Sequence, residues 1–180
     1  YNQLKEVFSK VSIASDVEGI LHWDMSTMMP SNSRQNRANQ LAFIANLKHS
    51  LLSDPSVTEL ISNIDSGQLS KNDLTNFKEM QREYVLLSSL PSDLVEAISK
   101  TSALCEGKWQ EAKKNCDFSI VKNSLNELIN LSRQESEILS EKLNCSPYEA
   151  LIQKYEPYSN VDHITKVFKD LEIFLLSSII

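Results

Sequence analysis

A proline at position 30 divides the start of this sequence into two stretches that both show helical periodicity. Proline lacks a backbone donor and disfavours helical geometry in the residue before it, so the Met28-Met29-Pro30 step ends one helix and turns the chain. Apolar residues recur at three- and four-residue spacings before the step, at Leu4, Val7, Phe8, Val11, Ala14, Val17 and Leu21. After it they recur at Leu41, Ile44, Ala45, Leu47, Leu51 and Leu52. The sequence therefore predicts two antiparallel helices as the opening motif.

Later helix starts are marked by capping residues and prolines. Asp54-Pro55 predicts a short helix to about residue 64 that Gly67 ends, and Ser70 with Asp73 predicts the next start. Pro91 is expected in the first turn of a helix that runs to about residue 114. Capping residues then predict helices at 117–144, at 146–157 with Pro157 as its stop, and from 160 onward. These patterns predict an all-α fold, a single unit of antiparallel helices over residues 1–180.

Composition excludes several classes of partner. The chain of 180 residues has 41% hydrophobic residues, only three glycines and five prolines, and a formal net charge of −6. Without a basic stripe to offset phosphate charge, we expect no nucleic-acid or membrane partner. Cys105, Cys116 and Cys145 fit neither a disulfide framework nor a metal knuckle, which favours a reducing, cytoplasmic location. The first residue and the uncapped apolar run at 173–180 suggest that both ends are cut.

The histidines are the obvious candidates for metal binding. His22 lies two residues from Asp24, but residues two apart on a helix point in different directions. We expect His22 and Trp23 to pack at the end of the first helix, and Asp24 to cap or to pair locally, with Arg34 and Arg37 as its candidate partners. His49 lies late in its helix, where the dipole favours a charged imidazole, and His163 lies in a first turn. The sequence therefore assigns no catalytic, cofactor-binding or metal-ligating residue.

Acidic and aromatic residues give two further candidate groups. Carboxylate pairs for acid-base chemistry could be formed by Glu106 with Glu111 and by Glu135 with Glu137, but a solvated face is the more common role. Aromatic residues that could line a peptide groove are Trp109, Tyr148, Tyr155 and Tyr158. Buried packing is the commoner fate of such rings, so none is assigned to a site.

Motifs along nearly the whole chain resemble one enzyme family. They are His22-Trp23-Asp24, Thr27-Met28-Met29-Pro30, Arg37, Gln40-Leu41, His49, the 90–95 segment LPSDLV, Trp109 with Ala112, Asp117-Phe118, the 146–151 segment SPYEAL and Tyr155-Glu156-Pro157. Together they resemble the N-terminal part of the carboxypeptidase Taq family. The resemblance implies a mostly helical, cytoplasmic, homodimeric enzyme that removes C-terminal residues from peptides with zinc or another divalent metal at a HExxH helix.

No HE pair occurs in this chain, because Trp23, Ser50 and Ile164 follow the three histidines. The resemblance thus implies that residues 1–180 are the N-terminal helical region of a longer enzyme. This region would wall the substrate groove and would be inactive alone, with the metal held downstream. The alternative is a stand-alone, non-catalytic helical interaction module from a split or degraded gene.

Overall fold

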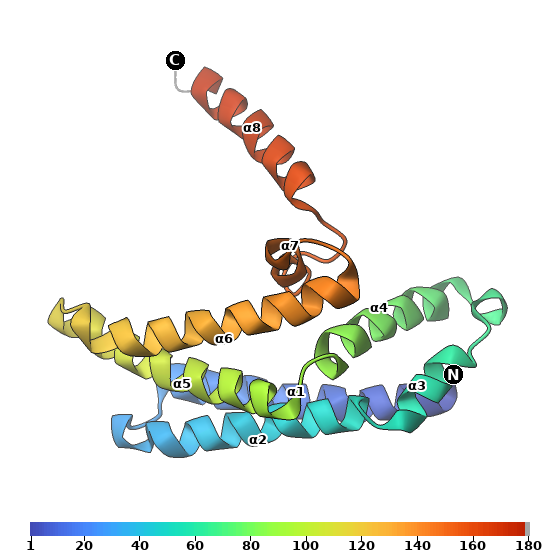
Figure 1. Ribbon diagram of the computed structural model, residues 1–180, viewed down its shortest axis with the longest axis horizontal. Helices are drawn as coiled ribbons and strands as arrows, with labels where there is room; N and C mark the ends of the chain where they lie inside the picture. Colours follow the sequence, from blue (N-terminus) through green and yellow to red (C-terminus); the bar gives the residue numbers. More distant parts are fainter. Residues whose placement is uncertain (179–180) are drawn as a thin grey trace. The chain divides into compact units, whose positions relative to one another are not determined.

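A computed structural model describes residues 1–178, and these residues form helices and turns without a strand (Figure 1). The α-helices are α1 (Asn2–Thr27), α2 (Arg34–Leu52), α3 (Pro55–Ser62), α4 (Lys71–Ser88), α5 (Ser92–Asn115), α6 (Ser119–Leu143), α7 (Pro147–Ile152) and α8 (Val161–Ser178). Short 3-10 helices lie at Ser31–Ser33 and Ser66–Gln68. The predicted all-α fold is confirmed. Ile179 and Ile180, the end of the uncapped apolar run, lie outside the described residues.

The internal contacts of the chain define two compact units, residues 1–135 and residues 136–180. The boundary falls within α6. The interpretation of residues 1–180 as one N-terminal region stays a prediction.

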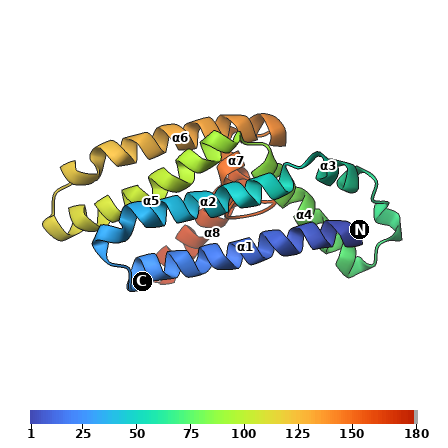
Figure 2. The ribbon, with the colours of Figure 1, turned by 90° about the horizontal axis from the view of Figure 1, so that it is seen from below.

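In the first unit, α2 packs against both α1 and α5 (Figure 2). The antiparallel pair of α1 and α2 follows from the turn at Pro30, as the sequence predicted. One core cluster joins α1, α2, α3 and α4 through Leu4, Phe8, Val11, Leu52, Val57, Phe77 and Met80. A second cluster joins α1, α2 and α5 through Met25, Ala38, Leu41 and Ala103. Small alanines at this crossing let the three helices approach closely. Val17, predicted to belong to the buried stripe of α1, is instead exposed.

The capping residues act as the sequence predicted. The Asp54 carboxylate accepts from the Ser56 N–H at 2.8 Å, and the Ser70 hydroxyl accepts from the Asp73 N–H at 3.2 Å. Ser146 and Glu149 form a complete capping box at the start of α7. The Asn160 side chain accepts from the His163 N–H at 2.8 Å at the start of α8. Each of these bonds satisfies a donor that the first helical turn leaves without an intrahelical partner.

Three predicted boundaries differ from the structure. Pro91 is the N-cap of α5 rather than a first-turn residue, and α3 ends at Ser62, before the predicted stop at Gly67. α7 ends at Ile152, well before Pro157. The Gln153 side chain holds the loop that follows, since it accepts from the Tyr158 N–H at 2.9 Å and donates to the Ser159 carbonyl at 2.6 Å. It thereby closes a loop in which Tyr158 takes a left-handed backbone with φ of 66°.

Candidate functional site

The end of α1 and the start of α2 are tied by one arginine. Arg37 donates from Nη2 to Asp24 Oδ2 at 2.6 Å, from Nε to Gln40 Oε1 at 2.8 Å, and from Nη1 to the Leu21 carbonyl. Of the two partners that the sequence left open for Asp24, the structure selects Arg37. Only 12% of the Arg37 side chain is exposed, and its guanidinium serves three acceptors at once. This arrangement holds the two helices in register.

His22 and Trp23 do not pack at this helix end, so that prediction was wrong. Both side chains are exposed, while Leu21 and Met25 of the same turns face the core. Trp23 lies on the opposite side of the helix from Leu21 and Met25, and His22 lies to one side of them, because successive residues advance by about 100°. His22 therefore has no role in the Arg37 arrangement.

His49 anchors α2 to the segment between α4 and α5. Its Nε2 donates to the Leu90 carbonyl at 2.7 Å, and the Ser53 hydroxyl lies 3.2 Å from the same nitrogen. The three histidines lie on α1, α2 and α8, as expected. In the described part of the chain, no three His, Cys, Asp or Glu side chains are grouped so that they could hold a metal ion.

The acidic residues separate into exposed and buried members. Glu111 lies 3.9 Å from Arg34 Nη1 and is half exposed, and Glu137 is exposed. Glu135, however, is only 5% exposed, so its assignment to a solvated face was wrong. A signal was present in the sequence, since Glu135 lies seven residues after Leu128 and four before Leu139 and thus falls in the apolar stripe of α6.

A groove of about 620 Å³ lies between the end of α5 and the start of α6. Its buried lining comes from Cys105, Ala112 and Val121, which form a small apolar cluster. Trp109 and Phe118 are exposed, with half of the Trp109 surface open to solvent. The Lys113 ammonium lies 5.3 Å from the centre of the Trp109 ring. This groove offers an apolar floor with an aromatic rim, which suits side-chain binding rather than acid-base chemistry.

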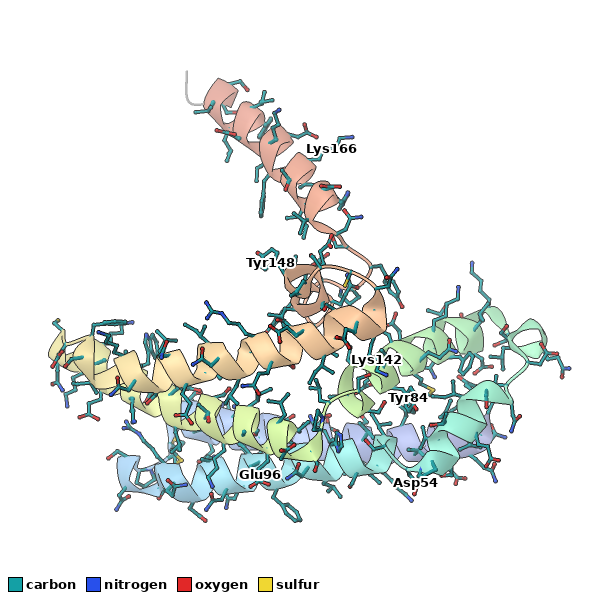
Figure 3. The ribbon with its side chains drawn as sticks, viewed as in Figure 1. Asp54, Tyr84, Glu96, Lys142, Tyr148 and Lys166 are labelled. Atoms are coloured by element: carbon teal, nitrogen blue, oxygen red, sulfur yellow. The ribbon has the colours of Figure 1, made fainter. Side chains whose placement is uncertain are left out.

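A second groove of about 480 Å³ lies in the second unit between α7 and α8. Tyr148 and Tyr155 line one side of it, and Ile164 and Phe168 line the other. Figure 3 shows the Tyr148 side chain on α7. The expectation that the aromatic candidates are buried was wrong for all four, because Trp109, Tyr148, Tyr155 and Tyr158 are exposed. Sequence reasoning could not find this, since exposure depends on which helix faces lack a neighbour.

The shifted pKa values belong to helix caps and to cysteines. Hydrogen bonds from Ser146, and a further one from the Val161 N–H, hold the pKa of Glu149 below its ordinary value. Burial raises the pKa of the Cys105 thiol and, together with the nearby Glu149, that of Cys145. A raised pKa disfavours the thiolate, which is the form of cysteine that acts as a nucleophile.

Among residues 1–178, no helix has the length and apolar character needed to cross a bilayer. The described residues therefore form a helical framework. Arg37 and His49 tie its helices together, and two grooves leave apolar surface open to solvent.

Comparisons with known proteins place this framework in a family. The family model described as carboxypeptidase Taq (M32) metallopeptidase matches residues 3–179. Thermostable carboxypeptidase 1 of Thermus thermophilus is 24% identical over 184 residues, a match that covers 96% of this chain and 36% of that protein. The structure of Trypanosoma cruzi metallocarboxypeptidase 1 matches with a TM-score of 0.78 and 28% identity, covering 97% of this chain and 35% of that one.

A structure titled "BsuCP Crystal Structure" shares the fold with a TM-score of 0.81 at 23% identity, and covers 95% of this chain and 35% of its own. This chain therefore spans about a third of the length of the relatives that it matches. Because the family model matches almost every residue, the chain belongs to the carboxypeptidase Taq (M32) family of metallopeptidases.

Proposed function

We propose that this chain is the N-terminal helical portion of a metal-dependent carboxypeptidase that removes C-terminal residues from peptides. The observation that carries the proposal is the family match over residues 3–179 in a chain that spans about a third of its relatives. The portion would serve as a wall of the peptide groove. Zinc or another divalent metal, a cytoplasmic location and a homodimer belong to the same proposal for the longer enzyme.

The residues present do not fit a catalytic zinc site. Such a site needs about three protein ligands that meet at one point, commonly two histidines one helical turn apart and a carboxylate. His22, His49 and His163 lie on separate helices, and His49 already donates to the Leu90 carbonyl. We therefore assign no metal ligand and no chemical step to this chain, and we expect the chemistry to reside in a HExxH helix elsewhere in the enzyme.

The framework contacts support a positioning role for the chain. Arg37 fixes α1 against α2, and His49 fixes α2 against the segment that precedes α5. These contacts hold α5, whose last turns carry the Trp109 groove. An exposed aromatic beside an apolar floor suits contact with peptide side chains, which is the observation that favours the groove-wall role.

The test compares two proteins, the chain of 180 residues and a protein extended through the downstream HExxH helix. After dialysis, metal analysis should find stoichiometric zinc only in the extended protein, because only that protein holds a ligand set. An assay for the release of C-terminal residues from a peptide should likewise detect activity only in the extended protein. Tight zinc binding by the shorter chain, or an inactive extended protein, would contradict the proposal.

The second candidate function is a stand-alone helical interaction module. The observation that favours it is α8, a helix of 18 residues without a buried side chain among those described. The downstream reading frame separates the two functions. A HExxH motif within the next few hundred codons favours the enzyme, whereas a natural stop codon soon after residue 180 favours the module.

A further inference from the structure

α8 presents an apolar stripe that its own unit leaves open. The stripe consists of residues that share one face of the helix, namely Val161, Ile164, Val167, Phe168, Leu171, Phe174 and Leu175. We call this set the α8 stripe. Phe168 and Phe174 are both about two thirds exposed. Contiguous apolar surface of this kind on a folded chain marks a site where another surface packs.

The first half of the α8 stripe faces the groove of α7. Ile164 and Phe168 line this groove opposite Tyr148 and Tyr155, and Leu151 and Ile152 complete its apolar lining. The groove is open, since both tyrosines and Phe168 remain exposed. The second half of the stripe, at Leu171, Phe174 and Leu175, continues along α8 beyond the groove. The two halves form one apolar track along the helix.

The spacing of the apolar residues along the α8 stripe matches an α-helix as the binding partner. Five members, Val161, Ile164, Phe168, Leu171 and Leu175, follow alternating steps of three and four residues. This is the spacing of the positions that meet a partner helix in a helical seam, where each side chain inserts between residues of the facing helix. A flat or extended partner would not match this alternation over four turns.

The charges beside the track indicate the chemistry of the occupant. Asp170 and Glu172 flank the stripe on its two sides, and Glu156 lines the groove. Lys166, labelled in Figure 3, and Lys169 lie further round the helix, away from the stripe. An acidic flank is complementary to a helix with lysine or arginine beside its apolar residues. A second copy of this chain would bring the same acidic flank to the contact.

We propose that the α8 stripe and the α7 groove bind an amphipathic helix with basic flanks that belongs to the part of a family-length carboxypeptidase not spanned by this chain. The proposal rests on the proposed function. Matched relatives are nearly three times as long as the spanned part, so they contain sufficient further polypeptide to supply such a helix. The bound helix would bury the stripe and join the second unit to the rest of the enzyme.

The test mixes the purified chain with a separately produced polypeptide, the part of Trypanosoma cruzi metallocarboxypeptidase 1 that this chain does not match. Sedimentation velocity and titration calorimetry should show a one-to-one complex. Leu171→Glu should weaken it by about tenfold or more, because the variant places a carboxylate in an apolar contact. The matched control is Leu176→Glu, the same change on the same helix but off the stripe, which should alter the affinity by less than about twofold.

Both leucines are exposed, at 46% and 60%, so neither variant disturbs a core, and circular dichroism should confirm unchanged helix content. Equal losses of affinity in Leu171→Glu and Leu176→Glu, or the absence of a complex, would overturn the proposal. So would a dimer of the chain itself that Leu171→Glu disrupts, because the occupant would then be a second copy. The readout is binding alone, so its outcome is separate from the metal analysis and the C-terminal release assay that test the proposed function.

Discussion

The guanidinium of Arg37 lies 2.6 Å from the Asp24 carboxylate and joins the first turn of α2 to the last turn of α1. Since Arg37 also donates to Gln40 and to the Leu21 carbonyl, it stabilises the turn at Pro30 through several bonds at once. Arg37→Lys keeps the positive charge but loses the forked set of guanidinium donors. We expect it to lower the free energy of unfolding by about 1–2 kcal/mol. Denaturant unfolding measures this change.

The matched control for that prediction is Arg34→Lys. The Arg34 guanidinium is 3.9 Å from the half-exposed Glu111, so the loss should be about 0.5 kcal/mol or less. Similar losses of unfolding free energy in Arg37→Lys and Arg34→Lys would show that the Arg37 hydrogen bonds stabilise the fold no more than the Arg34 ion pair does.

Gly107 of α5 makes room for the Arg34 side chain. A Cβ at position 107 would lie 2.6 Å from Arg34 Cδ, so the methyl group of Gly107→Ala must displace that arginine. In an Arg34→Ala background the obstacle is gone, and the same change should stabilise by about 1 kcal/mol through helix propensity. When Arg34 is present, the stabilisation by Gly107→Ala should be smaller or absent. A double-mutant cycle measured by denaturant unfolding tests this coupling, and strictly additive effects would refute it.

Ser146 opens α7 with a complete capping box. Its hydroxyl accepts from the Glu149 N–H at 3.3 Å, and the Glu149 carboxylate accepts from the Ser146 N–H at 3.2 Å. Ser146→Ala should lower stability by about 1 kcal/mol because a helix donor loses its partner. Ser9→Ala, on the exposed face of α1, is the control and should have no comparable cost. An unchanged unfolding midpoint and slope for Ser146→Ala would show that the cap does not stabilise the fold.

Glu149 makes the second unit sensitive to acid. Hydrogen bonds from Ser146 and Val161 lower its pKa in the folded state, so the folded chain binds this proton less readily than the unfolded chain. The resulting stabilisation is present above the unfolded pKa of about 4.3 and is lost as the pH falls through the lower, folded value. In Glu149→Gln this contribution is absent at every pH. The difference in unfolding free energy between the two proteins should therefore narrow on acidification, and a constant difference would contradict the assignment.

Cys116 and Cys105 should differ in reactivity towards a thiol reagent. Cys116 is exposed at the end of α5, whereas Cys105 is buried and burial raises its pKa. A thiol reagent should therefore modify Cys116 at least about tenfold faster than Cys105, because the reagent attacks accessible thiolate. Mass mapping of the labelled peptides gives the order, and Cys116→Ser should remove the fastest phase. Rapid labelling of Cys105 would show that the α5–α6 groove opens in solution.

The framework of the candidate site was partly predictable. The sequence left open whether Asp24 caps its helix or pairs locally, and it offered Arg34 and Arg37 as candidate partners. The choice needed the crossing of α1 and α2, which directs the Arg37 fork to three acceptors and leaves Arg34 beside Gly107 of α5. Contacts between α2 and α5 involve residues far apart in sequence, and no local pattern encodes them.

The sequence by itself determined the helices and most of their starts. The caps at Asp54, Ser146 and Asn160 are bonds between residues two or three apart, so the local chain contains both partners. The tertiary structure decided burial. Glu135 is buried and the four aromatic candidates are exposed because exposure depends on which helix faces meet a neighbour. Helical periodicity shows that a stripe such as that of α8 needs a partner surface, but only packing between distant segments decides whether the partner is present.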